Sequence, residues 1–164
     1  MNAYTAKAIA AAILRFSGDT GLKFSLDSIR SNSGLSVNQK LFRIEGLHLS
    51  PKATGAAQLS RMPIITFAVS KLTNKAKEKL AAFNAAATVV CGLQLSHEKQ
   101  IELQQETYEY VDSIVDVLHR SRGLWAQGVF YGGGFEASIA PISSGSLNYN
   151  QFATIEFEVT LWEV

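Results

Sequence analysis

The tripeptide Asp19-Thr20-Gly21 has the composition of the aspartic protease active site, in which two such carboxylates share one proton and activate water. In those proteases it follows an apolar strand and continues with a small residue. Here it follows a segment with helical spacing and precedes Leu22. Asp, Thr and Gly are also common in turns. The sequence therefore favours a turn from a helix into a strand over a protease site.

Two further segments contain residue types that are used in nucleotide binding or catalysis. Gly132-Gly133-Gly134 lacks both the Lys-Ser/Thr pair of a phosphate-binding loop and the glycine spacing of a dinucleotide site. It lies between aromatic, strand-like pieces and is expected to form a hairpin tip or a bulge. The run from Ser143 to Ser146 lacks the apolar strand and the spacing of a nucleophile elbow, so we expect a loop there.

The histidines and the cysteine also have spacings that argue against chemistry. His48, His97 and His119 are far apart, and none has a His, Cys or carboxylate at a recognised metal spacing. Cys91 lies in the apolar run ATVVCGLQL, which predicts a buried and unreactive thiol. We therefore expect no catalytic site, no metal and no cofactor, and a protein that is not an enzyme.

The chain has 164 residues, which suffice for one well-packed core, and we expect a single domain over residues 1–164. Lys and Arg number 15 and Asp and Glu number 14, so the net charge of +1 offers no general attraction to DNA or anionic lipid. The segment AIAAAIL lies between Lys7 and Arg15 and lacks a small-residue cleavage site, unlike a signal peptide. These features predict a protein of a reducing cytoplasm without membrane contact.

Hydrophobic patterning predicts the order of the elements. We expect a helix over 2–17, a loop over 31–39, strands over 40–49 and 62–70 with a polar excursion between them, a helix or mobile arm over 72–86, a strand over 88–95, a long helix over 98–122 and strands to the end. Strands on both sides of one long helix, without a regular strand–helix–strand repeat, predict an α+β domain. Its mostly antiparallel or mixed sheet packs against one long and one or two shorter helices.

The closing segment, Ala153 to Val164, alternates strictly and predicts a strand with one buried face. The residues expected in the core are Ala153, Ile155, Phe157, Val159 and Leu161. The residues expected on the other face are Thr154, Glu156, Glu158, Thr160 and Trp162. That face is either a channel lining or a water-exposed outer surface.

The long helix over 98–122 is expected to be amphipathic. Its apolar face comprises Ile101, Tyr108, Val111, Ile114, Val115 and Leu118, and its acidic face comprises Glu98, Glu102, Glu106, Glu109, Asp112 and Asp116. A row of like charges lowers helix stability, so either water or a basic partner must screen it. The contact predicted between subunits joins Lys71, Lys75, Lys77 and Lys79 to Glu102, Glu106 and Glu109.

The order of these parts resembles that of the tail-terminator and related neck proteins of tailed bacteriophages. The resemblance is carried by MPIITFAVS, the Lys- and Ala-rich excursion, ATVVCGLQL, EKQIELQQETYEYVDSIVDVLHRS, GVFYGGGFE and FATIEFEVTLWEV, roughly residues 60 to 164. It implies a single tail-terminator-like domain without a catalytic site. In that family six copies form a ring that caps the tail tube and faces the head.

The resemblance implies partners as well as a fold. They are further copies of the chain in a ring, the tail tube protein and the neck or connector proteins, in a virion assembled in the host cytoplasm. DNA passes through the ring without specific binding, and Glu156 and Glu158 are the expected channel face. Three alternatives remain: another neck or head-completion ring, an accessory subunit that binds a basic partner, and a small-ligand-binding α+β domain with Trp125 and Tyr131 lining a pocket.

Overall fold

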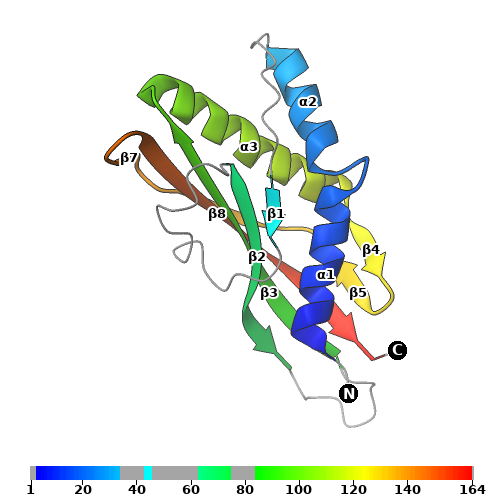
Figure 1. Ribbon diagram of the computed structural model, residues 1–164. Coiled ribbons are helices and arrows are strands. Elements are labelled where there is room, and N and C mark those ends of the chain that lie inside the picture. The colour runs from blue at the N-terminus through cyan, green and yellow to red at the C-terminus, as the bar shows by residue number, and fades with distance from the viewer. Residues whose placement is uncertain (1–2, 34–42, 46–62, 75–83, 164) are drawn as a thin grey trace.

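The computed structural model describes residues 3–33, 43–45, 63–74 and 84–163, and Figure 1 shows an elongated molecule built from one sheet and three helices. The elements are α1 (Tyr4–Ser17), α2 (Leu22–Ser33), β1 (Arg43–Glu45), β2 (Ile64–Thr73), β3 (Asn84–His97), α3 (Gln100–Arg120), β4 (Gly123–Ala126), β5 (Val129–Tyr131), β6 (Glu136–Ile139), β7 (Ser143–Ser144) and β8 (Tyr149–Trp162).

Strand β3 is the centre of the sheet and pairs antiparallel with β2 on one side and with β8 on the other. Beyond β2, the short strand β1 adds parallel to it. Beyond β8, three short strands pair antiparallel with it in succession, β7, β6 and β5, and β4 continues from β5. The expected α+β fold is confirmed, with a mostly antiparallel sheet, one long helix and two shorter ones.

The closing strand β8 is confirmed and begins earlier than expected, at Tyr149. It pairs with β3 along its whole length. The five apolar residues predicted for its core face are all buried, whereas Glu156, Glu158 and Thr160 on its other face are exposed. The period-two alternation of the sequence therefore predicted both the strand and which of its two faces is buried.

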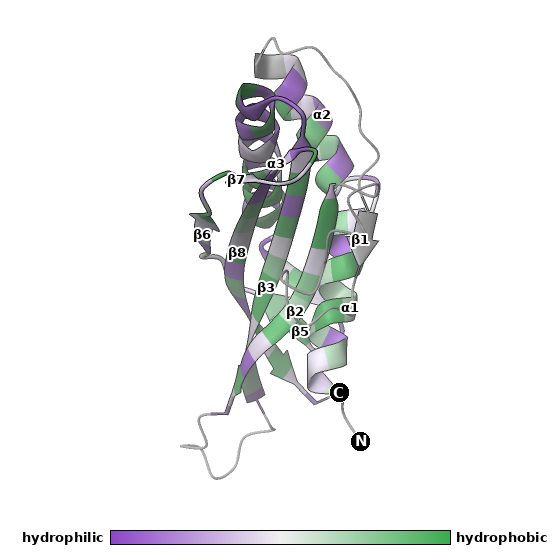
Figure 2. Ribbon diagram, turned by 60° about the vertical axis from the view of Figure 1, so that its left-hand side comes forward, coloured by the Kyte–Doolittle hydropathy of each residue, from purple (hydrophilic) through white to green (hydrophobic). Residues whose placement is uncertain are grey.

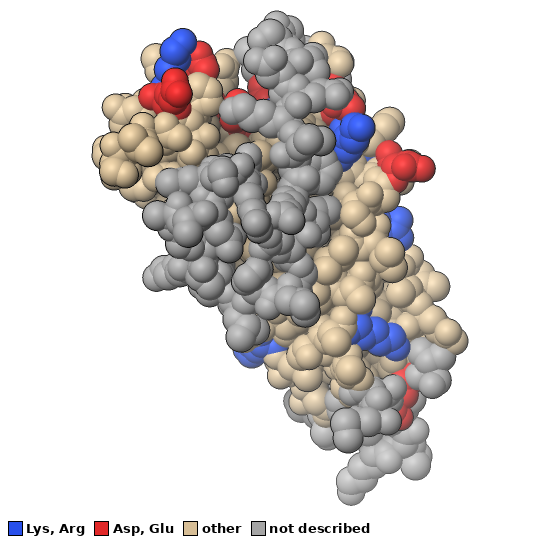
Figure 3. Space-filling model, in the orientation of Figure 1, with Lys and Arg blue, Asp and Glu red and all other residues tan. Residues whose placement is uncertain are grey.

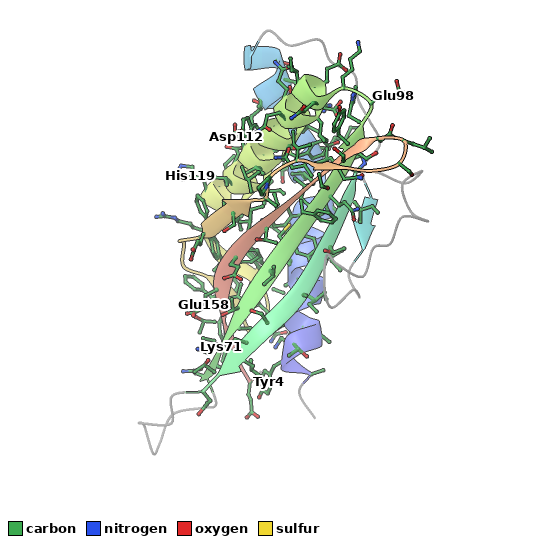
Figure 4. The ribbon with its side chains drawn as sticks, turned by 90° about the vertical axis from the view of Figure 1, so that its left-hand side faces the viewer. Tyr4, Lys71, Glu98, Asp112, His119 and Glu158 are labelled. Atoms are coloured by element: carbon green, nitrogen blue, oxygen red, sulfur yellow. The ribbon has the colours of Figure 1, made fainter. Side chains whose placement is uncertain are left out.

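The three helices form a layer on one face of the sheet and leave the opposite face without a helix (Figures 1 and 4). Ala8, Ala12 and Phe16 of α1 are buried in this layer, and the Phe16 ring lies 5.1 Å from that of Phe67 in β2. The small alanines let α1 approach the sheet closely. We call the opposite side, which carries Glu156 and Glu158, the helix-free face.

Helix α2 corrects two expectations. The segment after Gly21 is a helix and not a strand, and residues 31–33 of the loop expected over 31–39 belong to this helix; residues 34–39 lie outside the described part. Leu22 and Leu26 are buried one turn apart, but Ser25 and Arg30 are buried with them. Polar residues at buried positions hid the helical pattern.

The buried face of α3 is confirmed in its second half, where Val111, Ile114 and Leu118 are in the core, and wrong in its first half. Ile101 is 81% exposed and Tyr108 is 48% exposed. Leu103, Thr107 and Tyr110 are buried instead. The Thr107 hydroxyl donates a hydrogen bond to the Leu103 carbonyl at 2.8 Å, which satisfies a polar group inside the core and explains the misleading pattern.

Other predicted elements are settled only where the structure describes them. Strand β1 lies within the strand expected over 40–49. The helix or mobile arm expected over 72–86 is wrong at both ends, because 72–73 belong to β2 and 84–86 belong to β3, while 75–83 lie outside the described residues. Ser143 and Ser144 form β7 rather than a loop. Gly133 and Gly134, between β5 and β6, have φ of +106° and +89°, so they connect the strands through the left-handed region that favours glycine.

We predict that Gly21→Ala lowers the free energy of unfolding by about 1–3 kcal/mol, because the turn between α1 and α2 has no room for a side chain. A Cβ at this position would lie 2.3 Å from the Phe16 carbonyl oxygen and 2.8 Å from that of Arg15. Urea unfolding of the variant measures the loss. Gly132→Ala is the matched control, since its nearest neighbour is a Phe130 side-chain atom at 3.6 Å, and equal stabilities of the two variants would contradict the prediction.

Candidate assembly surfaces

A buried ion pair joins α2 to α3. Arg30 Nε lies 2.9 Å from Glu109 Oε2, and their side chains are only 3% and 12% exposed. The Arg30 guanidinium also lies 5.6 Å from the centre of the Tyr110 ring, and burial raises the pKa of Tyr110 to about 12. Glu109 is therefore an internal structural group as well as a member of the predicted acidic face.

A second polar cluster closes the other end of the same seam. Ser25 donates to Asp116 Oδ2 at 2.7 Å, Arg120 Nε lies 2.8 Å from the same oxygen, and Arg120 also donates to Ser25. Arg120 Nη1 donates to the Thr20 carbonyl at 3.0 Å, which ties the α1–α2 turn to α3. Burial favours the neutral form of Asp116, but the hydrogen bonds from Ser25 and Arg120 outweigh it and lower the pKa of this carboxyl.

This lowered pKa predicts acid sensitivity. A carboxyl whose pKa is lower in the folded than in the unfolded chain stabilises the fold above its unfolded pKa, ordinarily 3.8, and loses that contribution as the pH falls through the folded value. We expect Asp116→Asn to melt below the wild type at pH 7 and the difference to shrink below pH 3.8. Thermal melts across this range test it, and a difference that stays constant with pH would contradict it.

A histidine and a lysine contact Glu102 at the beginning of α3. His97 Nε2 lies 2.9 Å from Glu102 Oε2, and Lys99 Nζ lies 3.3 Å from Glu102 Oε1. The Lys99 backbone N–H donates to His97 Nδ1, so the imidazole proton is on Nε2 and points to Glu102. Figure 3 shows charged side chains gathered at this upper end of the molecule.

Because of these ion pairs, the acidic face of α3 is partly neutralised by residues of the same chain. Glu102 and Glu109, two of the acids in the predicted contact between subunits, already have cations of the same chain beside them. Glu106 is half-buried on α3. Lys71 is exposed on β2, whereas Lys75, Lys77 and Lys79 lie outside the described residues. The contact between these lysines and α3 of another subunit stays a prediction.

The helix-free face of the sheet carries the expected acids together with one that the sequence did not single out. Glu156 and Glu158 are exposed on β8, and β6 places Glu136 directly opposite Glu156. Lys71 lies two strands from Glu158, with Thr88 of β3 between them, and Figure 4 shows both charged side chains on this face. Like charges directly opposite each other on neighbouring strands are unfavourable.

A shallow hollow of about 400 Å³ lies on the same face, near the end of β8. Its lining is Lys71, Thr73, Asn84, Ala85, Ala86, Thr88, Glu158 and Thr160. Trp125 and Tyr131, which the small-ligand alternative places around a pocket, pack with their rings 5.2 Å apart, and both contact Phe157 at 5.5 and 5.7 Å. Tyr131 is buried in the core, and Trp125 is half-buried against it.

Large apolar side chains are exposed at the edge of the sheet that β4, β5 and β6 form. Leu124 and Phe130 lie opposite each other on β4 and β5, and both are exposed. Phe135, just before β6, and Ile139, the last residue of β6, are exposed as well. Leu124 and Phe130 share the helix-free face with Thr160, whereas Ile139 lies on the helix side with Ala153, so this apolar edge exposes large side chains on both faces of the sheet, as edges at protein contacts do.

The candidates for chemistry remain apart. Asp19 is exposed in the α1–α2 turn, and Cys91 is buried in β3. His97 ends β3, His119 lies in the last turn of α3, and His48 lies outside the described part. Burial raises the pKa of the Cys91 thiol. Over the described residues, no three His, Cys, Asp or Glu side chains are grouped to hold a metal ion. None of the described helices is both long and apolar enough to cross a membrane.

Comparison of the sequence with protein-family models and with curated proteins found no match. The sheet, its helix layer and its exposed surfaces are therefore what an assignment of function rests on.

Proposed function

We propose that the protein is a structural component of a virion, a tail terminator whose copies form a hexameric ring at the end of the tail tube. The observation that carries this proposal is the one-sided sheet: helices cover one face, and the other presents Glu136, Glu156 and Glu158 to the outside. The acidic face does not stabilise a single subunit. In a ring, the same face lines the channel and repels DNA, so that DNA passes without binding.

The exposed apolar edge supports the same proposal. Leu124, Phe130, Phe135 and Ile139 are exposed in the single chain, and burying them against another subunit is favourable. The partners of the ring are the tail tube protein and the neck proteins. Another ring component of the neck has the same requirements, and only its position in the virion differs.

The channel role predicts an effect of reversing the charge on this face. Glu156→Lys with Glu158→Lys leaves the buried face of β8 intact, so we expect normal folding and ring formation. Infectivity of a virus that carries the double substitution is expected to fall, because DNA binds to a basic channel. Plaque counts and electron micrographs of the particles measure the two effects. Full infectivity would contradict the channel role.

The hollow near Lys71 and Glu158 favours a second candidate, a module that binds a small polar ligand. Ligand binding there stabilises a single chain and does not require assembly. Saturable stabilisation of a monomer by a small molecule, lost in Lys71→Ala, distinguishes it from the ring.

A further inference from the structure

Among the strands that the structure describes, β2 and β6 each have an outer side without a complete partner strand. Within the described residues, β1 covers β2 only over Ile64–Thr66, and no strand pairs with the outer side of Lys71 to Thr73. Strand β6 pairs with β8 on one side and with no described strand on the other. Figure 2 shows β6 and β2 on opposite sides of the central strands β8 and β3.

Strand β6 is exposed on both of its faces, although it is hydrogen-bonded to β8. Its register places Glu136 on the helix-free face and Ala137 and Ile139 on the helix side, where their partners on β8, Ile155 and Ala153, are buried. The helix layer therefore covers β8 and stops short of β6. A short edge strand without a buried face is a surface that a further strand can complete.

The β2 edge has the complementary arrangement. Lys71 pairs with Thr88 and lies on the helix-free face, whereas Leu72 pairs with Ala87 and lies on the helix side, where it is 44% exposed. The β6 edge has an acid on the helix-free face and apolar residues on the helix side. When the two edges meet with their helix layers on the same side, Lys71 faces the acid of the β6 edge on the helix-free face. On the helix side, Leu72 faces the apolar residues of that edge.

Strand direction agrees with this match. Strand β6 is antiparallel to β8, β8 to β3, and β3 to β2, so β6 runs antiparallel to β2. A second copy in the same orientation can thus pair its β2 with β6 in an antiparallel ladder. Pairing of β6 with β6 would gather Glu136 and Glu156 of both copies, and this repulsion disfavours a twofold dimer.

We propose that the β2 edge of one copy adds to the β6 edge of the next, with Lys71 opposite Glu136 and Leu72 opposite Phe135. This inference rests on the proposed ring and specifies how it closes: a head-to-tail contact that repeats around the ring and joins the sheets, with every helix-free face on the same side. The lysine also relieves the repulsion between Glu136 and Glu156.

Charge reversal separates assembly from subunit stability. Glu136→Lys removes the unfavourable pair with Glu156, so the dissociated subunit is expected to melt higher while each contact weakens by about two- to fivefold. Lys71→Glu weakens the contact equally, and the double exchange restores it. Sedimentation velocity measures assembly, and Asp19→Lys controls for net charge. Unchanged assembly in both single variants would overturn the proposal.

A disulfide tests the register directly. Strands β2 and β6 of one copy are separated by β3 and β8, about 14 Å, which exceeds the roughly 7 Å limit between the Cα atoms of a disulfide. Oxidised Leu72→Cys/Phe135→Cys should therefore give a ladder of linked subunits, and each single variant should not. Assembly without the ladder would overturn this contact and leave the ring standing. A wild-type protein that stays monomeric at every concentration would overturn both.

Discussion

Phe157→Ala is expected to lower the free energy of unfolding by about 3–5 kcal/mol, the range found when a buried aromatic ring is truncated. Phe157 is 3% exposed at the centre of β8. Its ring contacts Trp125 of β4 and Tyr131 of β5, with centroids 5.5 and 5.7 Å away. The substitution therefore leaves a cavity where the main sheet meets the β4–β5 hairpin.

Urea unfolding monitored by tryptophan fluorescence measures this loss, because Trp125 lies beside the cavity. Thr160→Ala is the matched control: it lies on the same strand, on the helix-free face, and is exposed. We expect the control to stay within about 0.5 kcal/mol of the wild type. A loss below 1 kcal/mol for Phe157→Ala would mean that the β4–β5 hairpin does not pack on β8 as described.

Removal of one member of the Arg30–Glu109 pair is expected to be as damaging, about 3–5 kcal/mol. Arg30→Met leaves the Glu109 carboxylate buried at the α2–α3 seam without its cation, at 12% exposure of its side chain. An unpaired buried charge is far less favourable than the pair or than an apolar replacement of both. Most of the stability should therefore return in Arg30→Met/Glu109→Leu.

The exposed pair at the beginning of α3 is the control for this experiment. Lys99 and Glu102 are 73% and 48% exposed, so Lys99→Ala is expected to lower stability by less than about 1 kcal/mol. Thermal and urea unfolding of the three variants and the wild type give the comparison. Similar small losses for Arg30→Met and Lys99→Ala would show that the seam is open to water.

The closing strand could be predicted because its alternation is uninterrupted and both of its faces are decided by burial. Ile155, Val159 and Leu161 are in the core, and Glu156 and Glu158 are outside. When the alternation of a sequence matches the burial of the strand along its whole length, the strand can be predicted without knowing which strands pair with it. The α+β class followed from the order of such strands around one long helix.

Helix α2 and its contacts could not be predicted in the same way. Its buried side includes Ser25 and Arg30, and their partners Asp116 and Glu109 are 91 and 79 residues away in the sequence. Two polar residues facing inward look like a solvated surface when their partners are unknown. The acids on α3 consequently looked like one continuous charged row, although Glu109 and Asp116 contact side chains of α2 and Glu102 contacts His97 and Lys99.

The register in which β5, β6 and β7 pair with β8 could not be predicted from the sequence either. Three short strands share that edge, and only their order of pairing places Glu136 opposite Glu156. Short strands joined by glycine-rich segments have weakly specified registers in sequence. The acid that matters most to the proposed contact between subunits was therefore found only in the structure.

The mass of the full chain in solution, measured by light scattering coupled to gel filtration, tests the proposed ring most directly. We expect a discrete species of about 107 kDa, six times the 17.8 kDa subunit, that persists on dilution to micromolar concentration. A single species of 17.8 kDa at every concentration and salt would contradict it.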